Sequence, residues 1–307
     1  MSDLLYSQNP EWKDVTPVPQ DDGPNPLVPI AYAREYADAM DYFRAVTRTN
    51  EKSARVLSLI ENIIDMNPAH YTVWNYRQQV LFALEADLEK ELDYIDQIGP
   101  DQAKNYQVWH HRQVVVDRLG KGDREIPFIN SIFEEDPKNY HGWSYRQWVV
   151  KRFGLWDTEL DYTNDLLVFD VRNNSAWNYR YFVLFNRPST PTEDIIEDEI
   201  KFTEKQITLA PHNSSSWAYL KALYEKINRP FHTMLPFLDQ LKSSVESPFI
   251  LSAYIDMYEQ NAQLQNKPVE PAAIDMCQAL AEKHDAIREK YWQYRKSKLE
   301  KLNLAVE

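Results

Sequence analysis

Apolar residues recur every three to four positions along most of the chain, a spacing typical of amphipathic α-helices. The pattern begins near Tyr36, and from residue 73 it divides into pairs of helices joined by short loops. We expect the first helix of each pair at residues 73–84, 108–119, 143–153 and 177–185, and the second at 88–98, 125–133, 160–169 and 195–209. Less regular helices are expected at 234–241, 249–263, 272–283 and 287–302. Because no segment shows a convincing strand pattern, the sequence predicts an all-α fold.

One short motif returns at a nearly fixed interval within these helix pairs. It reads KNYQVWHHR at residues 104–112 and KNYHGWSYR at 138–146, and further copies surround Trp74, Trp177 and Trp217. Successive tryptophans of this motif lie 34 to 40 residues apart. A period of this length is typical of a solenoid built from one repeated helical hairpin. The fifth copy is weaker, because Leu220 stands where the others have arginine.

Residues 1–30 form a proline-rich arm ahead of the repeats. Five prolines between residues 17 and 29 prevent a continuous helix, because proline lacks the backbone amide donor. Two interpretations are open: a disordered tail, or an extended segment that lies on a partner with Trp12 as its anchor. We assign residues 31–307 to a single helical-repeat domain.

Four columns of the repeat have structural explanations. The tryptophans are expected to fill the seam between neighbouring hairpins, and the arginines at 77, 112, 146 and 180 to pair with the acidic second helices. The asparagines at 105, 139, 173 and 213 precede helix starts, where a side-chain oxygen can accept a hydrogen bond from a free backbone amide. The tyrosines at 71, 106 and 140 are candidate packing residues.

A fifth column is not explained by packing. Lys104, Lys138, Arg172 and His212 each lie five positions before a tryptophan, close to a helix start. A cation is electrostatically unfavourable at a helix N-terminus, whereas an anion is favoured there by the positive end and the free amides. Either these cations point into water, or they form a positive rim that binds a phosphate-bearing ligand or an acidic partner.

Composition narrows the classes of function. The chain of 307 residues has a net charge of −13, which argues against nucleic-acid binding. Its single cysteine, Cys277, can form neither an internal disulfide nor a cysteine-rich zinc site, and we predict no metal site in this chain. Phosphate-loop, nucleophile-elbow and signal-peptide patterns are absent, and no apolar run approaches the roughly 20 residues of a membrane span. We therefore expect a cytoplasmic protein without a membrane span.

The repeat motif resembles that of the protein prenyltransferase alpha-subunit repeat family. Two segments carry the likeness most strongly, KNYQVWHHR at 104–112 and DVRNNSAWN at 170–178. Within the family, the chain is most similar to the branch of alpha subunits shared by protein farnesyltransferase and geranylgeranyltransferase type I. The resemblance extends from Trp12 to the region of Trp292, and generic tetratricopeptide repeats have a different residue pattern.

The resemblance implies a fold, a partner and a reaction. The fold would be a right-handed, crescent-shaped superhelix of tetratricopeptide-like helical hairpins that wraps a beta subunit. The heterodimer would transfer a farnesyl or geranylgeranyl group from its diphosphate to the cysteine of a C-terminal CaaX motif, and this chain would be active only with its beta subunit. Zinc would be bound by the partner and not by this chain, and magnesium would accompany the diphosphate in farnesyl transfer.

Matching positions assign roles to individual residues. Lys104 matches the family lysine that contacts the diphosphate, and Tyr140 is expected to approach the same group, so both are predicted to be catalytic. Gln107 matches the glutamine at the substrate's C-terminal carboxylate. The other predicted substrate-binding residues are Tyr71, Asn105, Tyr106, Asn139 and His141.

Two other functions stay open. One is the alpha subunit of the Rab geranylgeranyltransferase, which in higher eukaryotes carries immunoglobulin-like and leucine-rich domains; their absence here and the proline-rich arm favour the first assignment. The other is a tetratricopeptide-like scaffold without catalysis, for which changes at Lys104 would affect no chemistry. The sequence does not fix which beta subunit is bound, and therefore leaves the isoprenoid length open.

Overall fold

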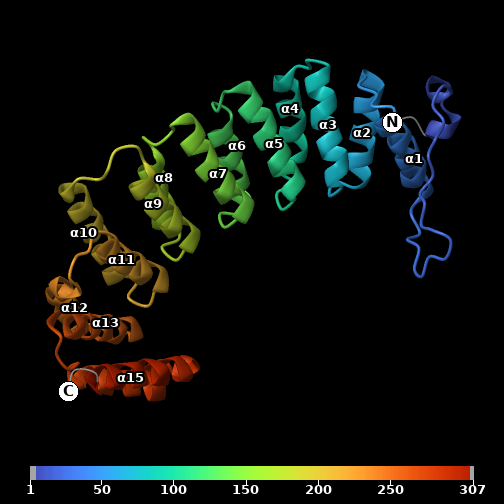
Figure 1. Ribbon diagram of the computed structural model, residues 1–307. Coiled ribbons are helices and arrows are strands. Elements are labelled where there is room, and N and C mark those ends of the chain that lie inside the picture. Colours follow the sequence, from blue (N-terminus) through green and yellow to red (C-terminus); the bar gives the residue numbers. More distant parts are fainter. Residues whose placement is uncertain (1–4, 305–307) are drawn as a thin grey trace. The chain divides into compact units, whose positions relative to one another are not determined.

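The computed structural model describes residues 5–304, and all regular elements in this range are helical (Figure 1). The chain divides into two compact units, Met1–Gly154 and Leu155–Glu307. In the first unit the α-helices are α1 (Arg34–Arg48), α2 (Ala54–Met66), α3 (Tyr71–Ala83), α4 (Leu88–Ile98), α5 (Tyr106–Leu119), α6 (Glu125–Glu135) and α7 (Tyr140–Phe153). In the second they are α8 (Glu159–Phe169), α9 (Asn174–Asn186), α10 (Glu193–Leu209), α11 (Ser214–Lys226), α12 (Leu235–Lys242), α13 (Pro248–Gln265), α14 (Pro271–Ala279) and α15 (Glu289–Leu304).

The predicted all-α hairpin pattern is confirmed. The tryptophan helices α3, α5, α7, α9 and α11 alternate with α4, α6, α8 and α10, as the periodicity indicates. Each repeat in such an array contacts mainly its neighbours, so a division between two repeats is compatible with one continuous array. The single domain predicted for residues 31–307, and the curvature implied by the resemblance, stay predictions.

An asparagine sets the start of each regular tryptophan helix from α5 onwards. The side-chain oxygen of each accepts a hydrogen bond from a backbone amide in the first turn; the residues are Asn105, Asn139, Asn173 and Asn213. These bonds satisfy amides that have no partner within the helix. The predicted capping role is confirmed, and it explains why these helices begin two or three residues before the first apolar residue of the periodic pattern.

The same asparagines connect each repeat to the preceding one. The Asn139 side-chain amide donates to the Ala103 carbonyl at 3.0 Å, and Trp109 Nε1 donates to the same carbonyl at 2.9 Å. Both lone pairs of one backbone oxygen are thereby used, one by each of two successive repeats. The arrangement recurs at the carbonyls of Pro68 and Val171. The tryptophans of the motif are between 1% and 7% exposed, so their predicted place in the core is confirmed.

Buried ion pairs form a second connection between repeats. Arg112 Nε and Nη2 donate to the two oxygens of Glu125 at 2.6 and 2.9 Å, and the Tyr145 hydroxyl donates to the same carboxylate at 2.6 Å. All three side chains are buried. Similar sets are Arg77 with Glu91 and His111, and Arg180 with Glu199 and Tyr219. The predicted pairing of arginines with acidic second helices is confirmed in these repeats, while Leu220 lies fully buried in the apolar core of the second unit.

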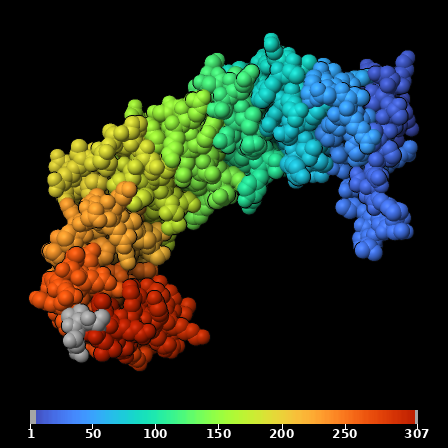
Figure 2. All heavy atoms as spheres, in the orientation of Figure 1, coloured from blue at the N-terminus to red at the C-terminus, as the bar shows by residue number. Residues whose placement is uncertain are grey.

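The N-terminal arm differs from both interpretations of the sequence. Trp12 is 3% exposed and packs edge-on against Tyr42 of α1, with 5.6 Å between ring centroids. The Tyr6 amide donates to Asp38 at 2.6 Å, and Arg55 of α2 forms a two-point ion pair with Asp14. Trp12 is therefore anchored in this chain's own core. Only the later part of the arm projects from the helices, where Leu27 is 99% exposed (Figure 2).

Repeat geometry continues beyond Trp217, where the sequence motif decays. The hydroxyl of Ser247 donates to the Pro211 carbonyl at 2.8 Å, and Trp217 Nε1 donates to the same carbonyl at 3.0 Å. Ser247 also accepts a bond from the Phe249 amide at the start of α13. It therefore takes the place that asparagine has in the other repeats, and its hydroxyl group acts both as cap and as connection.

Candidate functional site

Three tyrosines stand at equivalent positions on one edge of the first unit. Tyr71, Tyr106 and Tyr140 are the first residues of α3, α5 and α7, and they are 71%, 67% and 71% exposed. Because Cα–Cβ bonds tilt towards the N-terminus of a helix, a side chain at the first position points past the helix end. The packing interpretation is therefore wrong. Within residues 5–304 none of the three hydroxyl groups has a hydrogen-bond partner.

Lys104 lies beside the central tyrosine. Its side chain is exposed, and its ammonium group forms no ion pair or hydrogen bond with any residue that the structure describes. It lines an open hollow of about 390 Å³ together with Tyr106, Gln107 and Asp101. Ala69, just before α3, forms the opposite wall, so the hollow spans two successive helix starts.

His141 holds the next helix start against this hollow. Its ring meets that of Tyr106 edge-on, with 4.2 Å between centroids, and lies 5.4 Å from that of Tyr140. Burial lowers the pKa of His141 below its usual value, although a hydrogen bond with the backbone of Lys104 acts in the opposite direction. A neutral imidazole therefore connects the turn of Lys104 to α7 and places both exposed tyrosines around it.

The two asparagines of this edge face inwards. Asn139 is 2% exposed; its oxygen caps α7 and its amide binds the Ala103 carbonyl. Asn105 likewise caps α5 and donates to the Pro68 carbonyl at 2.8 Å. Both therefore fix the backbone that carries Lys104 and the tyrosines. Direct substrate contact by these asparagines stays a prediction.

Gln107 completes the hollow. Its backbone amide donates to Asn105 at 2.8 Å, whereas its side-chain carboxamide has no partner among the described residues. The hollow thus brings together an unpaired ammonium group, the phenol hydroxyl of Tyr106 and a carboxamide, and Tyr140 lies next to it across the His141 ring. These groups can donate hydrogen bonds to an anion without first breaking internal bonds.

The sequence had not indicated Asp101 or Gln102, which also line the hollow, because they lie in an irregular turn outside the repeat motif.

The remaining cations of the column have different surroundings. Lys138 is exposed, and its backbone amide donates to Asp136 at 3.1 Å. Arg172 and His212 are exposed in the second unit, at the starts of α9 and α11. Within the first unit, the exposed aromatic rings and the unpaired ammonium concentrate around Lys104.

Within residues 5–304, no group of three or more His, Cys, Asp or Glu side chains is arranged to hold a metal ion. No helix in the same range is both long and apolar enough to cross a bilayer.

Comparison with known families matches the repeats observed in the structure. The protein prenyltransferase alpha subunit repeat matches residues 53–84, 88–119, 123–153, 156–187 and 196–227. Each segment joins one second helix to the tryptophan helix that follows it, from α2 with α3 to α10 with α11. Arg112 and Glu125 therefore belong to successive repeats, as do Arg77 and Glu91.

Relatives align over nearly the whole chain. The protein farnesyltransferase/geranylgeranyltransferase type-1 subunit alpha of Dictyostelium discoideum is 39% identical, covering 94% of this chain and 92% of its own. The protein of the same name from Arabidopsis thaliana is 40% identical, covering 95% and 96%. A solved structure, Candida albicans protein geranylgeranyltransferase-I complexed with GGPP, aligns with a TM-score of 0.85 and 31% identity, over 97% of this chain and 100% of that one.

Similarity to the second type of alpha subunit is much more limited. The geranylgeranyl transferase type-2 subunit alpha of Rattus norvegicus is 31% identical over only 24% of this chain. Repeat pattern, residue matches and full-length relatives agree: the chain belongs to the protein prenyltransferase alpha-subunit family.

Proposed function

We propose that this chain is the alpha subunit of a heterodimeric protein prenyltransferase of the farnesyltransferase/geranylgeranyltransferase type I kind. Its helix-start edge contributes residues that contact an isoprenoid diphosphate and a CaaX-terminated protein substrate. Zinc held by the partner beta subunit would keep the attacking cysteine as a thiolate, and magnesium would accompany the diphosphate in farnesyl transfer. The full-length similarity to type-1 alpha subunits supports this assignment over the Rab enzyme.

The unpaired ammonium group of Lys104 is the observation that carries the proposal. A lysine near a helix start is disfavoured by the helix dipole, so the fold alone does not account for this cation. Lys104 is exposed and has no partner among the described residues, beside two aromatic rings that are also exposed. The edge is therefore built to bind something outside this chain, and the cation indicates an anionic group.

Lys104 acts on the departing diphosphate. As the bond between the isoprenoid carbon and its oxygen breaks, negative charge grows on the leaving group. An ammonium placed there stabilises the transition state more than the bound substrate, and only such a difference raises the rate. Tyr140 has a free hydroxyl at the next helix start and donates to the same group. His141 is neutral and orients the turn of Lys104, so it is a positioning residue.

Gln107 and the tyrosines bind the peptide substrate. The free carboxamide of Gln107 can donate to a C-terminal carboxylate, Tyr106 offers an exposed ring in the same hollow, and Tyr71 offers another at the preceding helix start. Asn105 and Asn139 support these residues through the caps of α5 and α7.

The test is single-turnover prenyl transfer by the heterodimer, measured beside equilibrium binding of the isoprenoid diphosphate. Lys104→Ala is expected to slow the transfer step by tens- to about a thousand-fold, by analogy with loss of one oxyanion donor, and to leave isoprenoid affinity nearly intact. Lys138→Ala is the matched control, because it removes the equivalent cation one repeat later, and it should have a much smaller effect.

Two outcomes would contradict the proposal at different levels. Transfer at the wild-type rate by Lys104→Ala would show that Lys104 has no catalytic role. Equal losses of rate and affinity would make Lys104 a ground-state anchor and place the residue that meets the developing charge on the partner. A wild-type heterodimer that transfers no prenyl group to a CaaX peptide would favour the non-catalytic scaffold.

A further inference from the structure

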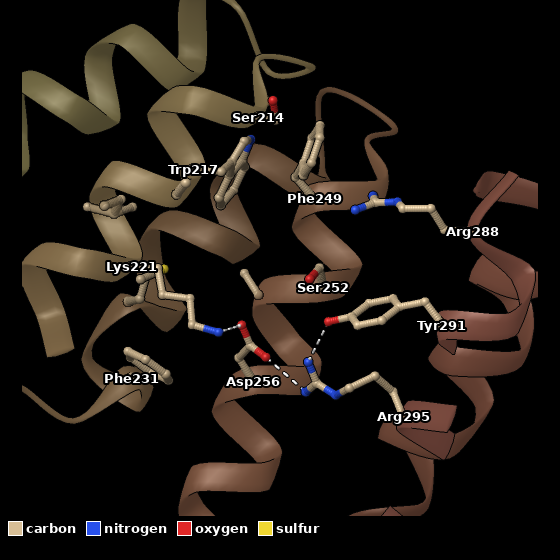
Figure 3. A pocket seen from close by; sticks show the side chains of 14 residues that line it. Ser214, Trp217, Lys221, Phe231, Phe249, Ser252, Asp256, Arg288, Tyr291 and Arg295 are labelled. Atoms are coloured by element: carbon tan, nitrogen blue, oxygen red, sulfur yellow. Dashed lines mark hydrogen bonds and ion pairs between the residues drawn. The ribbon is translucent and has the colours of Figure 1, made fainter. Parts of the chain in front are cut away.

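The second unit contains a pocket that the proposed function does not use. It has a volume of about 350 Å³ and lies between α11, α13 and α15 (Figure 3). Its floor and one wall are apolar, formed mainly by the rings of Trp217, Phe231 and Phe249. A concave apolar surface of this size with a few polar groups is the usual form of a binding site for small ligands.

A polar network forms the other side of the pocket. Asp256 of α13 accepts from Lys221 at 2.7 Å and from Arg295 at 2.9 Å, so these three charges largely satisfy one another. Arg295 also donates to the Tyr291 hydroxyl at 3.2 Å and to Glu259 at 2.7 Å. Figure 3 shows Tyr291 and Arg295 of α15, and Arg288 just before this helix, extending towards α13. The network fixes the pocket wall and leaves the Tyr291 hydroxyl hydrogen available to a ligand.

Arg288 is the one cation of the lining whose donors are mostly unused. Its Nε donates to Asp285 at 2.6 Å and its guanidinium lies over the rings of Phe249 and Trp292, but neither terminal nitrogen forms a hydrogen bond or ion pair within residues 5–304. The Ser252 hydroxyl, on the facing helix, likewise has no partner in that range. Arg288, Tyr291 and Ser252 therefore offer unused donors to the same cavity, above an aromatic floor.

Charge indicates what such a ligand carries. Three of the lining residues are cationic and one is anionic, in a chain whose net charge is −13. Asp256 and Glu259 bind Lys221 and Arg295, and Asp285 binds Nε of Arg288, so the donors that remain are the two terminal nitrogens of Arg288 and two hydroxyls. A planar carboxylate matches these two nitrogens in two-point geometry and carries a single charge, whereas a phosphate would bring nearly two.

We propose that this pocket is a binding site for an amphipathic carboxylate, with an aromatic or branched apolar group seated on Trp217, Phe231 and Phe249. The carboxylate binds the terminal nitrogens of Arg288 and accepts from the Tyr291 and Ser252 hydroxyls. Such a group is available from two sources, a free small acid or the C-terminal residue of a protein chain. The site requires no prenyl transfer, so its failure would leave the proposed function untouched.

Calorimetric titration of the full chain with N-acetylphenylalanine tests the proposal. N-acetylphenylalaninamide has the same ring without the charge and is expected to bind about tenfold more weakly, because it loses a charge-assisted pair. Arg288→Gln should weaken binding of the acid by about tenfold, while the amide should bind almost as before. Lys205→Gln, which removes an exposed cation elsewhere in the second unit, is the control and should leave both affinities unchanged.

A variant that fills the pocket tests the proposal without changing the charge of the site. Ala218 is exposed on α11 and lines the pocket, so Ala218→Phe fills the cavity without altering a core position. It should abolish binding of the acid while thermal unfolding stays at the wild-type temperature. A peptide ending in phenylalanine that binds more tightly than the single residue identifies a chain terminus as the source, and equal affinity identifies a small acid. Equal affinity for acid and amide, or no heat with the wild type at millimolar ligand, overturns the proposal.

Discussion

At the scale of single residues, position relative to a helix start decides whether a motif residue serves the fold or the site. Trp109 and Asn105 face inwards and use their polar atoms on backbone groups of neighbouring segments. Tyr106 lies between them in the sequence and is 67% exposed. One motif therefore builds the core with some residues and exposes polar and aromatic groups with the residues next to them.

Trp143→Ala is expected to reduce the free energy of unfolding by roughly 3–5 kcal/mol, the range for removal of a large buried aromatic side chain. Trp143 is 6% exposed and stacks on Phe133, and its Nε1 donates to the Pro137 carbonyl at 3.0 Å. Urea unfolding monitored by circular dichroism measures the change. A loss below about 1 kcal/mol would show that the column does not hold the repeats together, and Tyr140→Ala, at an exposed position of the same helix, is the control.

His111 gives one of the buried ion-pair sets a dependence on pH that the sets with tyrosine at this position lack. Burial lowers the pKa of His111 below its usual 6.5, and the hydrogen bond with Glu91 does not reverse this. Burial would raise the pKa of Glu91, but hydrogen bonds from His111 and Arg77 outweigh it and lower that pKa to about 2. The equivalent positions in later repeats are Tyr145 and Tyr219, which donate to their glutamates while uncharged. A neutral imidazole donates in the same way.

The sign of the effect follows from proton binding. Below pH 6.5 the unfolded chain takes up a proton at His111 that the folded chain refuses, so stability decreases as the pH falls. Glu91 contributes to this decrease only below its usual pKa of 4.5. His111→Tyr is therefore expected to reduce the fall in unfolding free energy between pH 7 and pH 5, measured by urea unfolding. His70 and His141 also have lowered pKa values, so part of the slope should persist, and exposed His110→Tyr should leave it unchanged.

At the scale of elements, the second helix of each repeat is joined to the preceding repeat by a buried charge. Removing one partner of such a pair leaves the other charge buried without compensation, at a cost of about 3–5 kcal/mol, whereas replacing both by apolar residues is often neutral. In the fifth repeat an apolar residue replaces the buried arginine, because Leu220 stands at the arginine position and is fully buried.

Arg112→Leu is accordingly expected to destabilise the first unit by roughly 3–5 kcal/mol, since Glu125 keeps only Tyr145 as its partner. Adding Glu125→Leu in the same chain should recover most of this loss, although Asp96 also loses its bond to Arg112. Urea unfolding of the two single variants and the double variant forms the cycle. Additive losses in the double variant would show that Arg112 and Glu125 are not coupled.

Helices and core were predictable because they depend on periodicity, and the asparagine caps because they depend on local chemistry. The packing of the N-terminal arm was not predictable from the sequence. Its five prolines argue only against a helix and do not indicate that Trp12 packs on Tyr42. Ser247 was missed because a cap can change its residue type while keeping its geometry. A further Trp-x-Tyr-Arg string, Trp292 to Arg295, lies outside the five copies identified from the sequence, and the structure buries Trp292 and pairs Arg295 with Glu259.

The roles of Lys104 and the tyrosines came from resemblance, and the exposure of the tyrosines from the structure. Periodicity places a residue on a helix but does not say whether the first position is covered by a neighbour. The hollow could not be predicted, because it depends on how Ala69 and Lys104, from successive helix starts, are spaced.

At the scale of the whole molecule, the proposed function has the chain present substrate-binding groups and rely on a partner for the group that reacts. Cys277, its single cysteine, is fully buried, and burial raises the pKa of that thiol to about 11. We therefore expect the purified, partner-free chain to show no prenyl transfer and to hold no tightly bound zinc. A transfer assay with and without co-purified beta subunit tests for prenyl transfer. Metal analysis after dialysis tests for bound zinc, and circular dichroism shows that the chain is folded. Stoichiometric zinc in the folded chain alone, or prenyl transfer without the partner, would contradict the proposed roles of the two subunits. If a Cys277→Ser chain still bound zinc, the ligands would be among the histidines and carboxylates of this chain.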